Sequence, residues 1–294
     1  MLVAAAVLGY LAGHHRPAPA PEEPARVAYQ ASFALEYPGT WQRTSAAPSI
    51  PGLQLSDPLL LAPGGDAGRA GLLSGQAAAG GAAPVPAAMV AAMQGLPRTE
   101  IVDLQNVQAY AYKGLRLAGF ARALDLYVIP ASSGPSTVLA CYAATPGSSD
   151  LTQCEHIAAK LTPVGQARYD LGPQPEYSGR LGAAIAALDS GRLVLRHQLG
   201  VKQRPAALAR VATVLAGHMA TAAAAIHTLP APATAQPAQA TLVASIDRAA
   251  AAYRSLAAAA PSVEIAAAQR EVDSAEGAID ISLENFALLG YKHS

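Results

Sequence analysis

The sequence predicts an α+β fold, in which an antiparallel-sheet α/β/α sandwich precedes an alanine-rich antiparallel four-helix bundle. Three observations support this prediction. Residues 27–164 contain short runs of alternating apolar and polar residues that Gly and Pro interrupt, a pattern typical of strands and turns. Across residues 177–294, apolar residues instead recur every three or four positions, as in amphipathic helices. A Gly- and Pro-rich stretch between them predicts a linker over residues 165–176.

The balance of charge argues against a nucleic-acid-binding protein. The 294 residues include 20 Lys and Arg against 20 Asp and Glu, so the formal net charge is zero. Proteins that bind nucleic acid usually carry a basic excess, because contacts with phosphate dominate their affinity. We therefore expect no nucleic-acid partner.

The first residues predict a membrane tether. Residues 1–13 form an uncharged apolar run, and residues 14–26 form a Pro-rich spacer. The run is shorter than the roughly 20 residues that a spanning helix needs, so it suits a signal-peptide core or part of a signal anchor. Pro21 follows the nearest A-x-A triplet and should obstruct cleavage there. We expect an uncleaved anchor with everything after residue 26 outside the cytoplasm. A buried amino-terminal helix is the alternative.

Strands and two helices are expected in order along residues 27–164. Phe33, Leu35 and Tyr37 alternate onto one face, and Pro38-Gly39 predicts a turn. Further strands are expected over residues 53–61, 70–77, 107–115, 123–131 and 137–144, and helices over 86–96 and 150–161. The last strand is apolar on both faces, which is typical of a central strand covered on both sides. Ser149 or Asp150 is the expected cap of the closing helix.

The motif F-x-L-x-Y-P-x-x-W at residues 33–41 opens this region, and a mid-chain helix, long antiparallel strands ending in VLACYAA and a final helix follow it. This order resembles the extracytoplasmic PsbP-like family and lipoproteins of the LpqN type, over about residues 27–164. The resemblance implies an α/β/α sandwich that serves as a non-enzymatic accessory or binding module, with no family active site to transfer. The chain departs from the family in its Gly- and Ala-rich region at 62–85 and in having no lipobox cysteine.

The only two cysteines, Cys141 and Cys154, are expected to form a disulfide. Cys141 falls on the predicted central strand and Cys154 in the first turn of the closing helix, and a cysteine pair in an exported protein is usually oxidised. Two free core thiols or a reactive site are the alternatives. A nucleophile formed by Cys154 and His156 is disfavoured, because neighbouring helical residues point in different directions.

Four helices are expected within residues 177–294. They cover residues 177–199, a segment that Pro205 opens, a segment after the break at 230–239, and a segment that starts at Pro261 with Ser262 as its cap. Sustained three- and four-residue spacing with short breaks indicates an antiparallel bundle. Many seam positions are Ala, so the helices should approach closely. The alternative is a set of long helices that pack on a partner.

An acidic stripe lies along one face of the last expected helix. It consists of Asp273, Glu276, Asp280 and Glu284. One interpretation is pairing with Arg192, Arg196 or Arg210 on neighbouring helices. The other is a cation site or a surface for a basic partner.

Motifs that carry known chemistry do not occur in this sequence. No Glu has a His three residues later, which di-iron bundles require, and His218 and His227 lie on opposite sides of one expected helix. Serine-hydrolase, Walker, dinucleotide-binding and zinc-protease signatures are missing as well. We therefore expect no catalytic residue, cofactor or metal that the sequence can identify.

Together these features predict a non-enzymatic, membrane-anchored binding or scaffold protein of the bacterial cell envelope. Its α/β domain would recognise an envelope protein, a lipid or a wall component, and the bundle would provide oligomerisation or a partner surface. One alternative is an envelope hydrolase with an unrecognised site in the α/β domain. Another is a structural component of a surface or secretion assembly.

Overall fold

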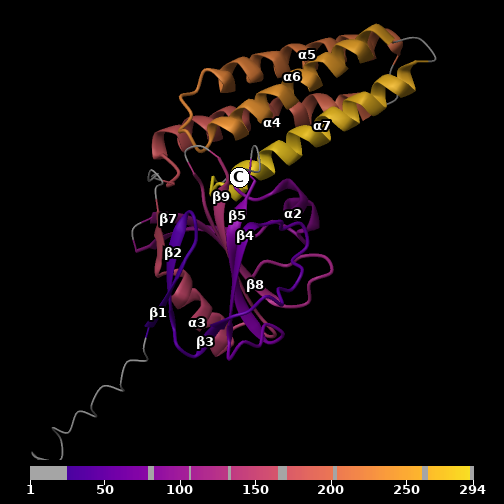
Figure 1. The fold of residues 1–294 in the computed structure, drawn as a ribbon. Helices are drawn as coiled ribbons and strands as arrows, with labels where there is room; N and C mark the ends of the chain where they lie inside the picture. Colours follow the sequence, from indigo (N-terminus) through magenta and orange to yellow (C-terminus); the bar gives the residue numbers. More distant parts are fainter. Residues whose placement is uncertain are drawn as a thin grey trace, which may run out of the picture.

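The computed structural model describes residues 25–78, 83–105, 107–131, 134–164, 171–200, 204–259 and 264–291. They form a part built on β-sheets and a bundle of four long helices that lie side by side next to it (Figure 1). The predicted α+β fold, a sandwich followed by a helical bundle, is thereby confirmed. The expected anchor and the expected cap Ser262 lie outside the described residues.

A seven-stranded antiparallel sheet forms the centre of the first part. Its strand order is β3-β4-β5-β9-β8-β7-β6. The strands are β3 (Trp41–Arg43), β4 (Ser56–Pro63), β5 (Ala70–Ala77), β6 (Arg98–Leu104), β7 (Val107–Lys113), β8 (Ala123–Ile129) and β9 (Ser136–Ala143). Every residue of the central strand β9 is buried, which confirms the prediction of a strand covered on both faces.

A smaller sheet and a helix cover one face of the large sheet. The smaller sheet has the order β1-β2-β10, with β1 (Ala25–Tyr29), β2 (Phe33–Pro38) and β10 (Leu161–Pro163). Phe33, Leu35 and Tyr37 are buried on β2, as their alternation predicts. They pack in one hydrophobic core with helix α3 (Ser149–Ala158) and the facing side chains of the large sheet.

The closing helix differs from the prediction at both ends. Its cap is Ser148, whose hydroxyl accepts a hydrogen bond from the Leu151 amide at 3.3 Å, and not Ser149 or Asp150. The helix ends at Ala158, and Leu161 belongs to β10, where it pairs with Leu35 of β2. This pairing with a strand far along the chain overrides the local helical pattern, so the prediction of a helix to residue 161 was wrong.

The other face of the large sheet carries a second helix and the end of the bundle. Helix α2 (Ala87–Ala92) is shorter than predicted, because Met93 adopts an extended conformation and forms a bridge with Leu117. The bundle helices are α4 (Pro175–Gly200), α5 (Pro205–His227), α6 (Gln236–Ala259) and α7 (Ile265–Leu288). Pro205 opens α5, as predicted.

Small residues let the bundle helices approach closely. Many of the buried positions on α5 and α6 are Ala, as the sequence indicates. At the contact of α4 with α5, a Cβ atom on Gly191 would overlap the ring of His218. Helices α6 and α7 run antiparallel, since Ser245 contacts Ser282 at 2.9 Å whereas Tyr253, further along α6, contacts Glu276, which comes earlier on α7.

The bundle and the large sheet share one hydrophobic core. Tyr110 and Tyr112 of β7 belong to the same buried cluster as Phe286 and Leu288 of α7. The Tyr112 hydroxyl donates a hydrogen bond to the Leu288 carbonyl at 2.8 Å, and α7 reaches the sheet at this point (Figure 1). The two parts are therefore packed directly against each other at the end of α7.

One helix of the described residues, α5, is long and apolar enough to cross a membrane by length and composition alone. Its buried side chains, which include Leu215, Met219 and Ile226, pack inside the bundle. Core helices of bundles pass the same test, so the composition of α5 is weak evidence for a membrane span.

Two buried tyrosines should make the protein sensitive to alkali. Burial raises the pKa of Tyr110 and of Tyr142 from 10.0 to about 12. In the unfolded chain both ionise near the ordinary value, so their stabilising contribution is complete below pH 10.0 and is lost as the pH rises to about 12. The free energy of unfolding should fall in this range by at most about 1.4 kcal/mol per pH unit for each tyrosine.

Denaturant unfolding at stepped alkaline pH checks this expectation. The variant Tyr142→Phe should lose less stability than the wild type over the same range, because it has one buried phenol fewer. Tyr29→Phe removes an exposed tyrosine and should follow the wild-type profile. Identical profiles for Tyr142→Phe and the wild type would contradict the expectation.

Candidate functional site

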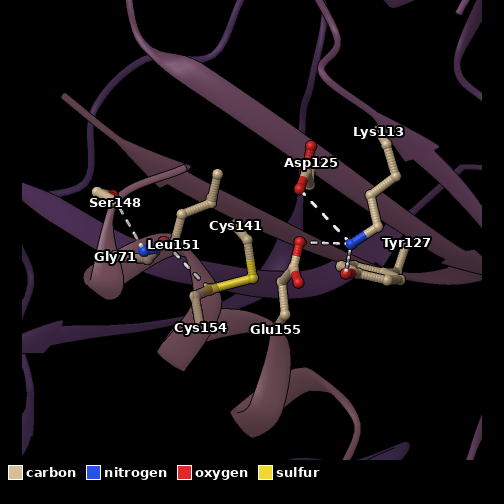
Figure 2. The surroundings of a disulfide bond; sticks show 9 residues. All are labelled: Gly71, Lys113, Asp125, Tyr127, Cys141, Ser148, Leu151, Cys154 and Glu155. Atoms are coloured by element: carbon tan, nitrogen blue, oxygen red, sulfur yellow. Dashed lines mark hydrogen bonds and ion pairs between the residues drawn. A yellow bond between two sulfur atoms is a disulfide. The ribbon is translucent and has the colours of Figure 1, made fainter. Parts of the chain in front are cut away.

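A disulfide joins the central strand to the helix that covers it. Cys141 on β9 and Cys154 on α3 are bonded, with Cα atoms 5.7 Å apart and both residues fully buried (Figure 2). This confirms the predicted pairing. It also removes Cys154 as a free nucleophile beside His156, whose side chain is exposed.

A charged cluster lies next to the disulfide, where β7, β8 and α3 meet (Figure 2). Lys113 ends β7, and its ammonium group forms ion pairs with Glu155 of α3 and, at 3.6 Å, with Asp125 of β8. It also donates a hydrogen bond to the Tyr127 hydroxyl at 2.6 Å. Asp125 in turn accepts a hydrogen bond from the Gly114 amide at 2.6 Å. The single lysine is therefore held by three groups from two elements.

The environment shifts the pKa values of this cluster in different directions. Burial lowers the pKa of Lys113, but its hydrogen bonds to Glu155 and Tyr127 outweigh burial and leave the pKa above its usual range. Burial and the neighbouring Glu155 raise the pKa of Asp125. Burial also acts to raise the pKa of Glu155, yet its hydrogen bonds with Asp125 and Lys113 prevail and lower it. The cluster thus favours a charged Lys113 and a charged Glu155.

A cavity of about 640 Å³ opens beside the cluster. This volume lies in the range of about 300–1,000 Å³ that is usual for small-molecule sites. Its apolar lining includes Leu115, Phe120 and Leu151. Its charged lining consists of Lys113, Arg116, Arg122, Asp125 and Glu155. Two smaller hollows have volumes of about 270 Å³ each. One lies beside β3 and β4, and the other lies on the surface of the bundle.

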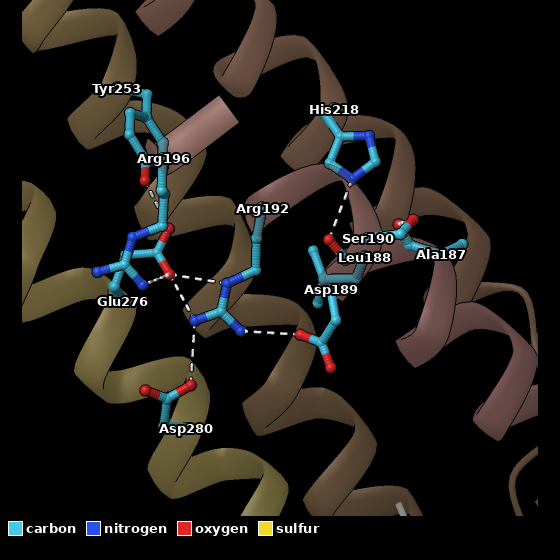
Figure 3. Close-up of polar contacts among 10 residues, drawn as sticks. All are labelled: Ala187, Leu188, Asp189, Ser190, Arg192, Arg196, His218, Tyr253, Glu276 and Asp280. Atoms are coloured by element: carbon cyan, nitrogen blue, oxygen red, sulfur yellow. Dashed lines mark hydrogen bonds and ion pairs between the residues drawn. The ribbon is translucent and has the colours of Figure 1, made fainter. Parts of the chain in front are cut away.

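The bundle contains a second polar cluster, whose centre is buried (Figure 3). The side chains of Arg192 on α4 and Glu276 on α7 are only 8% and 2% exposed. The Arg192 guanidinium donates to Glu276 at 2.8 Å and to Asp280 at 3.0 Å. The Tyr253 hydroxyl of α6 donates to the other Glu276 oxygen at 2.6 Å, and Arg196 lies 3.4 Å from Glu276. These contacts tie three helices together.

The structure divides the predicted acidic stripe into two pairs of residues. Glu276 and Asp280 bind arginine of α4, as the pairing interpretation predicts, whereas Arg210 forms no ion pair with the stripe in the described part of the chain. Asp273 and Glu284 are exposed on α7, and a role for them in binding a partner stays a prediction. Among the described residues, no group of three or more His, Cys, Asp or Glu side chains is placed to hold a metal ion.

The predicted surface or core role of the bundle histidines is consistent with their contacts. The ring of His218 contacts the Leu188 carbonyl at 3.2 Å (Figure 3). His227 is exposed near the end of α5.

The charged cluster beside the disulfide was missed by sequence reasoning. Lys113, Asp125 and Glu155 belong to no motif. They meet only because β7 pairs with β8 and because α3, which packs on β9 and β5, brings Glu155 to Lys113. One local signal was available: Asp125 is the only charged residue in the otherwise apolar strand ALDLYVI. A buried carboxylate in such a strand requires a partner, so Asp125 alone indicates a buried polar cluster at this position.

Comparisons with known proteins identify no family for this chain. No protein-family model and no curated protein matches the sequence. A crystal structure at 1.50 Å resolution from Bacteroides thetaiotaomicron VPI-5482 is similar over 78% of this chain and 77% of that chain, with 11% identity and a TM-score of 0.31. Likeness at that level carries no argument about fold or function. The resemblance to the PsbP-like family therefore stays a prediction.

Proposed function

We propose that this protein is a non-enzymatic binding protein of the cell envelope, tethered to the membrane through residues 1–13, with its ectodomain outside the cytoplasm. The observation that carries the proposal is the cavity beside the disulfide. It combines a volume of about 640 Å³, which is in the usual range of small-molecule sites, with an apolar wall and several charged side chains that could orient a ligand. The bundle would then act as a scaffold, and oligomerisation through it remains part of the proposal.

The disulfide supports the proposed compartment. Disulfides persist in secreted and extracytoplasmic proteins and are rare in the reducing cytosol. The Cys141–Cys154 bond is buried in the core of the α/β part, where it joins strand to helix. An oxidised structural pair of this kind agrees with a domain that folds after export.

Binding is a better proposal than catalysis because Lys113, Asp125 and Glu155, the cavity groups suited to acid–base or nucleophilic chemistry, are already paired with one another. Lys113 is bonded to two carboxylates and a phenol, so it has little capacity to act as a nucleophile or a base. Among the described residues that line the cavity there is no Ser, His or free Cys. The hydrolase alternative would favour a polar pocket containing such side chains.

One observation favours the hydrolase alternative to a limited extent. Asp125 and Glu155 both form ion pairs with Lys113, and their pKa values are shifted in opposite directions, a pattern found in acid–base pairs. Turnover of an envelope substrate that Asp125→Asn abolishes would establish this alternative and overturn the proposal.

Filling the cavity tests the proposed function directly. Ala121 lines the cavity and is exposed, so Ala121→Trp should occupy it without displacing buried atoms. We expect the wild-type chain to retain a component from an envelope extract without converting it, and Ala121→Trp to lose that component. Ala31→Trp adds the same side chain at an exposed turn outside the cavity and should behave as the wild type. Retention by all three proteins would contradict the proposal.

A further inference from the structure

The connection between β7 and β8 presents two arginines to the cavity. Arg116 and Arg122 both line it, together with Phe120 of the same connection. Backbone hydrogen bonds fix this segment: the Gln94 amide donates to the Arg116 carbonyl at 2.9 Å, and the Ala118 amide donates to the Ala92 carbonyl at 2.8 Å. The arginines therefore start from a backbone that is already positioned, which lowers the entropy lost on binding.

The positive charge of the cavity lies on these two arginines. Lys113 is neutralised by Glu155 and Asp125, the two carboxylates of the lining. In the part of the chain that the structure describes, neither Arg116 nor Arg122 forms an ion pair. The guanidinium of Arg122 lies over the ring of Tyr142, 5.5 Å from its centroid. A cation–π contact of this kind does not use a hydrogen-bond donor in an ion pair, so the guanidinium N–H groups can still bind an anion.

Apolar side chains lie in the same cavity as the arginines. Phe120 is half-buried, and Leu115 and Leu151 are buried. A small inorganic anion would leave this apolar surface without a contact, and a purely apolar ligand would leave the guanidinium groups unused. A ligand that matches both features has an acidic head and a short apolar body.

We propose that the cavity binds a small amphipathic anion, with a carboxylate or phosphate head on Arg116 and Arg122 and an apolar body against Phe120. This inference rests on the proposed binding function and names its ligand class. The same chemistry is present in a free fatty acid and in the head and first carbons of an acidic lipid, so the test includes a probe for each.

Calorimetric titration of the full chain tests the proposal with defined probes. Decanoate should bind more tightly than decanol, which has no charge, and than acetate, which has no apolar body. Arg116→Ala and Arg122→Ala should each raise the Kd for decanoate about tenfold, because each removes a charge-assisted hydrogen bond. Neither should change the Kd for decanol. Arg26→Ala removes an exposed arginine of β1 outside the cavity and should change neither Kd.

Dihexanoyl phosphatidylglycerol, which has an acidic head, is compared with decanoate to distinguish the two sources of the ligand. Dihexanoyl phosphatidylcholine, which has no net charge, is the matched control lipid. Tighter binding of the anionic lipid than of decanoate would assign an acidic lipid head, and the reverse order would assign a free fatty acid. A Kd for decanoate that is the same in the Arg116→Ala/Arg122→Ala double variant and in the wild type would overturn the proposal. If Ala121→Trp still abolishes retention of the envelope component in that case, the cavity binds a ligand of another class. If Ala121→Trp has no effect, the proposed function fails as well.

Discussion

Replacing Arg192 by Leu is expected to lower the free energy of unfolding by about 3 kcal/mol, at the low end of the usual effect of breaking a buried ion pair. The substitution leaves the Glu276 carboxylate, which is 2% exposed, without its closest cation. Arg196 stays 3.4 Å from Glu276 and is partly exposed, so it compensates only in part. Urea unfolding monitored by far-UV circular dichroism measures the loss.

Two further variants show whether the loss comes from the unpaired charge. Arg180→Ala breaks an ion pair with Glu176 in which the two side chains are 56% and 78% exposed. It should change the free energy of unfolding by no more than about 0.5 kcal/mol. Arg192→Met combined with Glu276→Leu removes both buried charges and should recover most of the loss. A single Arg192→Leu variant as stable as Arg180→Ala would contradict this account of the bundle.

Replacing Phe286 by Ala is expected to lower the free energy of unfolding by about 3–5 kcal/mol. Phe286 is fully buried on α7 and packs edge to face on Tyr291, with ring centroids 5.9 Å apart. It lies in the core that the bundle shares with Tyr110 and Tyr112 of the large sheet. The substitution should therefore weaken the α/β part as well as the bundle.

Two spectroscopic signals report separately on the unfolding of the α/β part and of the bundle. Trp41, the single tryptophan, lies buried on β3 and reports on the α/β part, whereas far-UV circular dichroism is dominated by the long helices. Both signals should shift together in Phe286→Ala. Ile281→Ala removes a side chain that is 61% exposed on the same helix and should change stability by no more than about 0.5 kcal/mol. A shift of the circular dichroism alone would show that the two parts unfold independently.

The elements with strong local patterns could be predicted from the sequence. Alternation on β2, the two-sided apolar run of β9 and the helical spacing of α6 and α7 each reflect burial of a particular face, and burial leaves a periodic pattern in the sequence. Cys141 and Cys154 could be paired because each lies on an element that the sequence places correctly.

Elements whose form depends on distant partners could not be predicted. β6 is an edge strand with mostly half-buried residues, so it shows no clear alternation. β1 and β10 are short and owe their extended form to pairing with β2 on either side. Local propensity is weak in such segments, and tertiary contacts decide their conformation.

The candidate site could not be predicted for a similar reason. Lys113, Asp125 and Glu155 meet only through strand pairing and helix packing, and the arginines reach the cavity from a loop. In the bundle, by contrast, the spacing of Glu276 and Asp280 along one helix face indicated a charged partner, because residues one turn apart share a surface. Arg192 was among the partners expected for them.

Native mass spectrometry of the full chain, purified from its own membranes without reductant, tests the central claim that the cavity beside Cys141–Cys154 is an extracytoplasmic binding site. We expect the chain to carry the mass of the oxidised cysteine pair and a small-molecule adduct. Ala31→Trp should keep the adduct and Ala121→Trp should lose it. Reduced cysteines, or an adduct that Ala121→Trp retains in full, would contradict the account.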